Sequence, residues 1–251
     1  MKLLRFLGDD GQARYGAVEQ RQIRELAGAP FGPIKFGPRS FFLEDVTLLP
    51  PCEPSKIIAV GVNYRAHAKE MGHAEPAEPV LFFKPPSALI GSGAAVHYPD
   101  GVTRLDYEAE LAVVIKKKAK SVTPAHARDV ILGYTCMNDV TARDLQKKDL
   151  QWARAKGFDT FAPMGPWVVT DLDPANLKIE AILNSTTKQS GTTADMIFPV
   201  DRLIAFISSV MTLWPGDVIT TGTPPGIGPM QRGDTIEVVI EGIGRLVNRI
   251  E

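Results

Sequence analysis

The stretch from Leu105 to Ile115 constrains the fold of this chain more than any other, because it joins acidic residues to an apolar run. Its second half is apolar and rich in β-branched residues, which is typical of a buried strand. Side chains alternate between the two faces of a strand, so Asp106, Glu108 and Glu110 are predicted to share one face. Two carboxylates about 7 Å apart repel each other by roughly 2–3 kcal/mol at an effective dielectric constant near 20. A strand that enters a hydrophobic core therefore needs a cation to relieve this repulsion.

Two explanations of this strand remain open on its sequence alone. A hard divalent cation, bound through oxygen ligands at about 2.0–2.6 Å, would neutralise the acids. Alternatively, the acids form the solvated face of an edge strand in an antiparallel sheet. Asp139, which follows a predicted strand over 133–137, can supply a third carboxylate to the first arrangement. Three carboxylates without a Cys/His cluster favour Mg²⁺, Mn²⁺ or Ca²⁺ over zinc.

The length and composition of the chain favour an ordinary β-rich globular protein. Its 251 residues are enough for one large domain, or for one large and one small domain. The 22 glycines and 20 prolines favour many short strands and shaped loops over a helical bundle. The net charge of −1 and the pI of about 6.4 indicate neither a nucleic acid nor an anionic membrane as a partner.

The cysteines and the chain start predict a cytoplasmic protein. Cys52 and Cys136 are far apart and do not suggest a disulfide framework, so a reducing compartment is expected. The first residues carry charges within their apolar part and lack a cleavage site, unlike a signal peptide. No window of 18 consecutive apolar residues occurs, which argues against a membrane-spanning helix.

Residues 1–52 are predicted to form a small N-terminal β-rich domain. Lys2–Leu7 and Arg14–Glu19 lie on either side of a turn sequence and therefore predict a hairpin. The proline-rich segment Leu49–Pro54 is the predicted boundary, because proline runs interrupt both helices and sheets. Residues 53–251 are then predicted to form the second, larger domain.

Two predicted helices of the larger domain have different roles. The clearer one, Asp201–Trp214, carries core residues along one apolar stripe. The shorter one, Tyr64–Met71, is predicted to be capped by Asn63 and carries His67 and Glu70 at positions i and i+3. In such a pair the carboxylate orients the imidazole and raises its basicity, which suits an acid–base dyad. An ordinary surface helix that happens to carry a His and a Glu is the alternative.

The other titratable residues give weaker signals. Lys156 begins a segment, Lys156–Pro163, whose turn-forming and aromatic residues predict a shaped loop. A lysine in such a loop can stabilise developing negative charge, although an isolated lysine is more commonly solvated. The remaining histidines show no partner in the sequence and are interpreted as solvated or structural; they are His73, His97 and His126.

Six segments of the chain together resemble one enzyme family. They are Ile57–Tyr64 followed by His67 and Glu70, Phe83–Ser87, Asp106–Leu111, Asn138–Gln146, Lys156–Phe161 and Thr221–Gly228. Through these motifs, residues 54–251 resemble the fumarylacetoacetate hydrolase family, and the short N-terminal piece resembles that of its smaller bacterial members. The resemblance implies an α+β, β-rich fold, a mixed β-sandwich roll with a small N-terminal β domain, assembled as a homodimer.

The resemblance also implies three groups of site residues. The metal ligands, for Mg²⁺ or Mn²⁺ with Ca²⁺ as an alternative, would be Glu108, Glu110 and Asp139. The catalytic residues, a dyad on a lid helix and a lysine beside the metal, would be His67, Glu70 and Lys156. The residues that line the substrate pocket would be Arg143, Gln146 and Thr223.

Such a site implies an enzyme that acts on small 2-oxo acids or 1,3-diketo acids through a metal-held enolate. C–C bond hydrolysis of an acylpyruvate or fumarylpyruvate is favoured. The alternatives are a decarboxylase and an enol–keto isomerase of the 2-hydroxyhepta-2,4-diene-1,7-dioate type, because one enolate serves all three reactions. Two rivals lie outside the resemblance. One is a non-catalytic, Ca²⁺-stabilised domain that binds a small acid, and the other is a two-carboxylate glycosidase, which leaves His67 and Lys156 without a role.

Overall fold

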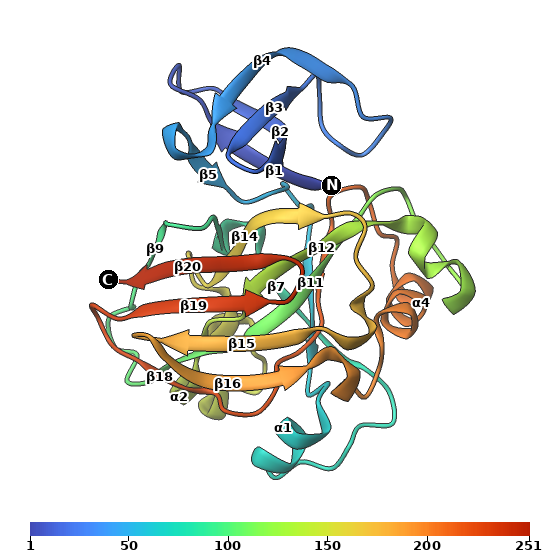
Figure 1. Ribbon diagram of the computed structural model, residues 1–251. Coiled ribbons are helices and arrows are strands. Elements are labelled where there is room, and N and C mark those ends of the chain that lie inside the picture. Colours follow the sequence, from blue (N-terminus) through green and yellow to red (C-terminus); the bar gives the residue numbers. More distant parts are fainter.

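The computed structural model describes residues 1–251 as an α+β, β-rich fold built from three sheets and a few short helices (Figure 1). The largest sheet has the strand order β4 (Phe36–Phe42), β3 (Gln22–Leu26), β2 (Ala13–Glu19), β1 (Lys2–Leu7), β14 (Ala162–Val169), β12 (Ile131–Asn138), β11 (Ala109–Ile115), β17 (Val218–Thr220), β6 (Ile57–Gly61) and β7 (Val80–Lys84). Two short strands pair beside this row, β5 (Thr47–Leu49) with β1 and β8 (Leu89–Ile90) with β14.

The second and third sheets are smaller. One has the order β16 (Thr186–Thr192), β15 (Lys178–Leu183), β19 (Thr235–Ile240), β20 (Gly244–Ile250) and β9 (Ala95–Val96). The other has the order β13 (Thr141–Ala142), β10 (Leu105–Tyr107) and β18 (Gly228–Met230). Figure 1 shows the five-stranded sheet stacked on the central strands of the large sheet, which gives the body of the molecule its sandwich form.

The helices are short and lie at the edges of the sheets. The α-helices are α1 (Arg65–Glu70), α2 (Arg143–Lys148), α3 (Ala153–Gly157) and α4 (Val200–Val210), and the 3₁₀ turns are Leu43–Asp45, Pro86–Ala88, Pro124–Val130, Pro174–Asn176 and Thr193–Asp195. No helix is both long enough and apolar enough to cross a membrane.

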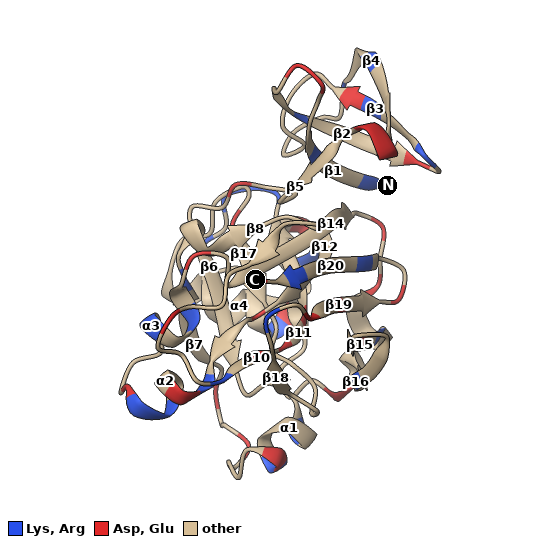
Figure 2. Ribbon diagram, turned by 90° about the vertical axis from the view of Figure 1, so that its left-hand side faces the viewer, with Lys and Arg blue, Asp and Glu red and all other residues tan.

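The central strands are buried on both faces, whereas the outer sheet has one solvated face. All seven residues of β11 are buried, and β12 and β17 pair on its two sides. In β19, buried and half-buried residues alternate, as expected of a strand with one face toward the core. Figure 2 shows charged residues mainly on loops, helices and outer strands, while the core strands β6 and β17 carry none. The edge-strand explanation of the acidic stretch is therefore wrong.

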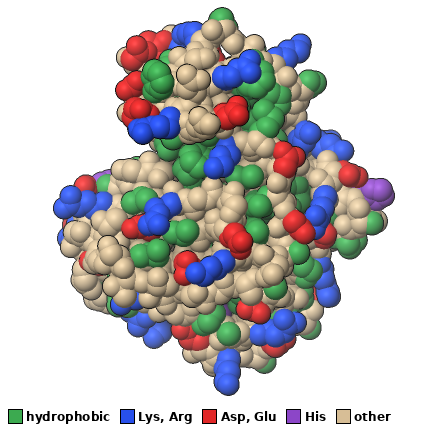
Figure 3. All heavy atoms as spheres, in the orientation of Figure 1, with side chains coloured by type: hydrophobic (Ala, Val, Ile, Leu, Met, Phe, Trp, Pro, Cys, Tyr) green, Lys and Arg blue, Asp and Glu red, His purple; other side chains and the backbone are tan.

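The N-terminal strands form a lobe of their own at one end of the molecule. They contain the predicted hairpin of Lys2–Leu7, which is confirmed, with its second strand beginning at Ala13. A separate apolar cluster fills this lobe; it consists of Leu4, Phe6, Val18 and Ile23. Figure 3 shows the lobe joined to the body through a narrower neck where hydrophobic side chains gather. Within the neck, Lys2 and Leu3 of β1 pair with Val169 and Val168 of β14.

The structure corrects two predicted element boundaries. Helix α4 ends at Val210, not at Trp214, which is 46% exposed and therefore lies outside the core stripe. The hydroxyl groups of Ser208 and Ser209 donate to helix carbonyls in its last turn, a contact that competes with backbone hydrogen bonding. The segment Lys156–Pro163 is not one loop, because α3 contains Lys156 and β14 begins at Ala162.

Asn63 does not cap the first helix, as its position in the sequence suggested. Its fully buried amide donates to the carbonyls of Phe198 (3.0 Å) and Thr221 (2.8 Å) and accepts from the N–H of Phe198 (2.8 Å). Tyr64 occupies the N-cap position and provides no side-chain hydrogen bond. One amide thus connects the end of β6 to two loops that are distant in sequence, which fixes the position at which α1 starts.

Asn63→Ala is expected to lower the free energy of unfolding by about 3 kcal/mol, because three buried backbone groups lose their partner. Urea denaturation followed by tryptophan fluorescence measures this loss. Asn176→Ala is the matched control, since Asn176 is exposed and accepts one hydrogen bond, from Thr192. Equal stability of the two variants would show that the Asn63 amide does not hold these loops.

Candidate metal centre and active site

The acidic stretch is two strands and not one, and the break between them builds the site. Glu108 lies between β10 and β11, and its N–H donates to the side-chain oxygen of Asn138 (2.9 Å) instead of to a strand. The N–H of Asp139 in turn donates to the carbonyl of Glu108 (2.9 Å). Asp106 therefore stays in the three-stranded sheet, where it accepts from Arg104 and Arg143, and it does not join the other two acids.

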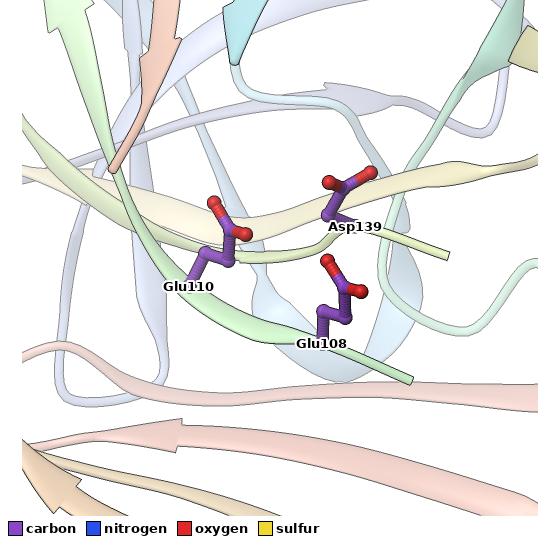
Figure 4. A group of neighbouring side chains, drawn as sticks. All are labelled: Glu108, Glu110 and Asp139. Atoms are coloured by element: carbon purple, nitrogen blue, oxygen red, sulfur yellow. The ribbon is translucent and has the colours of Figure 1, made fainter. Parts of the chain in front are cut away.

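Glu108, Glu110 and Asp139 converge as buried carboxylates. Each of the three side chains offers an oxygen that lies within 4.8 Å of the other two. They are only 5%, 2% and 1% exposed, in the same order. Figure 4 shows Glu110 on the strand β11, Glu108 just before it, and Asp139 directly after β12, with the three carboxylates close together.

Two lysine ammonium groups hold two of these carboxylates in place. Nζ of Lys156 donates to Glu108 (2.8 Å) and to Asp139 (2.6 Å). Nζ of Lys84 donates to the other oxygen of Asp139 (2.6 Å) and to the carbonyls of Val140 (3.2 Å) and Lys156 (2.6 Å). All three donors of Lys84 are thereby used, whereas Lys156 keeps one N–H for a ligand.

Lys84 is a site residue that the analysis of titratable residues missed. The signal in the sequence is its position at the end of a strand, two residues after Phe82, directly before two prolines. That position can equally be a solvated strand end. Only the packing of β7 against β6 and α3 shows that Lys84 is 1% exposed and points at Asp139.

Arg143 acts as a clamp on the acids. It is 3% exposed and donates to Glu108 and to Asp106 (2.9 Å), while its remaining terminal nitrogen donates to the side-chain oxygen of Gln146 (2.5 Å). Each of its three guanidinium nitrogens therefore donates to a group within the protein. The amide nitrogen of Gln146 remains available and lines the cavity beside the carboxylates.

Of the three carboxylates, Glu110 alone has no direct ion pair. Burial alone would raise the pKa of Glu108, but Lys156 and Arg143 outweigh it and hold that pKa well below the usual range. Burial, together with Asp139 and Glu108, raises the pKa of Glu110 to about 8. Burial lowers the pKa of the Lys84 ammonium, whereas for Lys156 the attraction of Asp139 and Glu108 exceeds the effect of burial and raises the pKa.

Glu110 is held by neutral donors only. Its Oε2 accepts from the hydroxyl of Thr220 and from the N–H of Gly222 (2.8 Å), so Oε1 remains for another ligand. Gly222 has a φ of +88°, and a Cβ there would lie 2.8 Å from Asn63, so the loop requires glycine at this position.

The donor set fits a hard divalent cation. All the potential ligands are carboxylate oxygens, and no cysteine or histidine belongs to the cluster. Mg²⁺, Mn²⁺ and Ca²⁺ accept such ligands, whereas zinc sites normally contain nitrogen or sulfur. Burial and the neighbouring Asp139 and Glu108 raise the pKa of Glu110, and a cation bound beside it would lower that pKa.

His67 and the three carboxylates line one cavity of about 60 Å³. Nδ1 of His67 lies 2.8 Å from one oxygen of Glu70, and the other oxygen of Glu70 accepts from the N–H of Gly226 (2.9 Å). Glu70 thereby attaches α1 to the loop that follows β17. His67 is 6% exposed, so the surface-helix alternative is wrong for this residue.

The structure changes the interpretation of Thr223 and of one histidine. Thr223 lines the cavity, but its hydroxyl donates to the carbonyl of Ala109 (2.9 Å) and accepts from Gln189 (2.8 Å), so it is a wall with no free donor. One histidine differs from its interpretation as partnerless: Nδ1 of the exposed His126 lies 3.0 Å from Asp129. His73 is exposed, as expected, and lines the cavity.

Comparisons with known proteins cover both parts of the chain. A family model described as Fumarylacetoacetate (FAA) hydrolase C-terminal matches residues 56–251, and one described as Rv2993c-like, N-terminal matches residues 1–51. Protein Rv2993c of Mycobacterium tuberculosis is 46% identical over 259 residues, which span 100% of this chain and 98% of that protein.

Solved structures of similar proteins match nearly the whole length of both chains. The 2-hydroxyhepta-2,4-diene-1,7-dioate isomerase of Mycobacterium marinum is 45% identical, with a TM-score of 0.93 over 100% of this chain and 98% of the other. The maleylpyruvate hydrolase of Sphingobium sp. SYK-6, solved with manganese (II) ion and pyruvate, is 32% identical, with a TM-score of 0.82 over the same two shares.

Glu110→Gln is expected to weaken the binding of Mg²⁺ or Mn²⁺ at least about tenfold, because it replaces an anionic ligand by a neutral amide. Isothermal calorimetry measures the affinity. Glu25→Gln is the matched control: Glu25 is also buried and ion-paired, to Arg14 and Arg39, but it lies in the N-terminal lobe. Unchanged metal affinity in the Glu110 variant would remove it from the ligand set.

Metal affinity is also expected to depend on pH through Glu110. The pKa of about 8 means that the carboxyl is protonated below pH 8, and a cation must displace that proton. The affinity should therefore rise with pH, by up to about tenfold per unit between pH 6 and 8, and then level off. Competition titrations at pH 6, 7 and 8 test this, and a constant affinity across that range would contradict it.

Proposed function

The chain belongs to the fumarylacetoacetate hydrolase family, and we propose that it is a divalent-metal-dependent enzyme acting on 2-oxo acids, with C–C hydrolysis of an acylpyruvate as its main reaction. One observation carries the proposal. The three carboxylates and His67, which is paired with Glu70, line the same small cavity, so a bound acid would meet both the metal ligands and the imidazole at once. Metal centres of this kind leave coordination positions open for substrate.

The metal ligands in this proposal are Glu108, Glu110 and Asp139. A divalent cation bound by them would supply Lewis-acid stabilisation to negative charge that develops on a 2-oxo acid. Lys156 would add a fixed positive charge, because its third N–H can donate to an oxygen of the acid. The free amide N–H groups of Gln146 would orient the carboxylate of the acid.

His67 is the proposed general base. With Glu70 ionised and accepting the Nδ1–H, Nε2 keeps its lone pair and is available to the cavity. Nε2 takes a proton from a water molecule, and the water oxygen bonds to the distal carbonyl carbon of the acylpyruvate. The C–C bond then breaks, its electron pair leaves with the enolate of pyruvate, and the imidazolium returns the proton to carbon.

Enol–keto isomerisation is the second candidate, and the 45% identity to the Mycobacterium marinum isomerase favours it. The same base would move a proton between oxygen and carbon, with no water added. Decarboxylation is a third outcome of the same enolate chemistry, for a 2-oxo acid that carries a second carboxylate on C3, because loss of that carboxylate as CO₂ leaves its electron pair in the enolate. The products distinguish the three: two acids, one isomer, or CO₂.

The test is turnover of acylpyruvates, followed by the loss of diketone absorbance with Mg²⁺ or Mn²⁺ and after exhaustive chelation. Chelation should abolish the activity, and added metal should restore it. A non-catalytic Ca²⁺-binding domain shows no turnover, and a glycosidase does not consume the diketone. Full activity after chelation would overturn the proposed role of the metal.

His67→Ala is expected to lower kcat at least about a hundredfold, because it removes the base. Metal affinity, measured by calorimetry, should change less than about threefold, since His67 is not among the ligands. His126→Ala is the matched control, because His126 has the same i, i+3 pairing with a carboxylate, on the surface. A wild-type rate in the His67 variant would remove that residue from the mechanism.

A further inference from the structure

A second, larger cavity opens directly beside the metal centre. It has a volume of about 340 Å³, and its lining consists of Gly61, Val62, His73, Ala74, Pro76, Val80 and Trp152. Four of these residues also line the small cavity at the carboxylates, so the two spaces adjoin; they are Gly61, Val62, His73 and Trp152. No lysine, arginine, aspartate or glutamate lines the larger cavity.

One face of β7 runs from the metal centre to this cavity. Every second residue of a strand faces the same way, so Lys84, Phe82 and Val80 share one face of β7. The Cα atoms of neighbouring members of this set are about 6.6 Å apart. Lys84 contacts Asp139, the ring of Phe82 lies 5.2 Å from Nζ of Lys156, and Val80 lines the larger cavity. This face changes from cation to aromatic ring to aliphatic side chain with distance from the carboxylates.

Trp152 completes the apolar wall. Its ring meets that of Phe82 edge to face, with centroids 5.2 Å apart. It also packs on the backbone of β6 at Gly61, where a Cβ would lie 2.9 Å from the indole ring. Glycine at this position thus allows Trp152 to lie flat enough against β6 to form a side of the cavity.

The cations near the cavity are already paired. Arg143 and Lys156, which line the small cavity, donate to buried carboxylates. Arg65, at the start of α1, lies 3.6 Å from Glu75. A carboxylate placed against this lining would contact apolar side chains and no lining cation, which is less favourable than the same contact made by an uncharged, apolar group.

We propose that the larger cavity binds the distal end of the substrate's acyl group, and that this end is uncharged and apolar. The proposal rests on the proposed function, since the pyruvate end must lie at the carboxylates. It selects acylpyruvates with an aliphatic chain or an aromatic ring, and it disfavours substrates with a second, terminal carboxylate. Trp152, Phe82 and Val80 are then the residues that determine specificity.

Binding of two matched acids in the presence of Mg²⁺ tests the inference without turnover. 2-Oxooctanoate and 2-oxooctanedioate have eight carbons each and differ only at the far end, where the dioate has a carboxylate in place of a methyl group. Neither is a 1,3-diketone, so neither can be cleaved. Each buried methylene improves affinity by about fourfold, so 2-oxooctanoate should bind well over tenfold more tightly than pyruvate. The dioate should bind at least tenfold more weakly than the monoacid by calorimetry.

Val80→Lys changes the chemistry of the cavity without touching the metal centre. It should strengthen binding of the dioate at least fivefold and weaken binding of 2-oxooctanoate, with pyruvate unchanged. Phe83→Lys is the matched control: Phe83 is 49% exposed, compared with 48% for Val80, and lies on the opposite face of β7. Its affinities for all three acids should stay within about twofold of the wild-type values. His73→Ala removes the one titratable side chain of the lining and should leave the preference for the monoacid intact.

The outcomes separate this inference from the proposed function. If the metal-loaded protein does not bind pyruvate, the proposed function is wrong, and the inference fails with it. If pyruvate binds but the dioate binds as tightly as 2-oxooctanoate, the inference is overturned and the proposed function stands. The wild-type comparison decides this even if the Val80 variant does not fold.

Discussion

The need to neutralise three buried carboxylates is the constraint on which the rest of this structure depends. At about 5 Å, two unit charges repel by roughly 3 kcal/mol even at an effective dielectric constant of 20, so three acids in one core require compensation. Lys84, Lys156 and Arg143 compensate Glu108 and Asp139 through direct ion pairs. Glu110 has only neutral donors, and it is the carboxyl whose pKa is raised. Glu110 is thus the carboxylate without a direct ion pair, and a divalent metal could supply one.

This constraint explains the irregular backbone around the site. A continuous strand would place Asp106 with the other acids, but the break at Glu108 moves Asp106 into another sheet, where two arginines hold it. Buried amides then replace the missing ladder bonds. Asn138 accepts from Glu108, and Gln189 accepts from the N–H of Ala109 (2.9 Å) while donating to the loop after β17. Buried backbone N–H groups beside the carboxylates thereby gain partners that the strand ladder does not give them.

The predicted site residues all lie in the larger part of the molecule, outside the N-terminal lobe. Every predicted site residue lies between His67 and Thr223, within the part that the fumarylacetoacetate hydrolase model matches. The N-terminal lobe and α1 lie at opposite ends of the molecule in Figure 1. The lobe extends the large sheet through β1 and β14 and packs around its own cluster. The chemistry therefore depends on the central strands and on α1, whose one link to the loop after β17 is the Glu70–Gly226 hydrogen bond.

Local patterns in the sequence were enough to predict the hairpin of β1 and β2 and to select Glu108, Glu110 and Asp139, because strand periodicity and apolar runs are properties of neighbouring residues. They left open whether the acidic stretch is buried, and they wrongly placed Asp106 with the other two acids of that stretch. They could not distinguish His67–Glu70 from His126–Asp129, which share one spacing; only packing buries His67 beside the carboxylates and leaves His126 exposed. They also could not reveal Lys84 as a partner of Asp139, 55 residues away, or Asn63 as a tie to Phe198, 135 residues away. Burial and long-range pairing depend on which segments meet in space. The sequence determined which groups could do this chemistry, and the tertiary structure decided which of them meet, because a charge or an amide acquires its role only from the partner that folding brings to it.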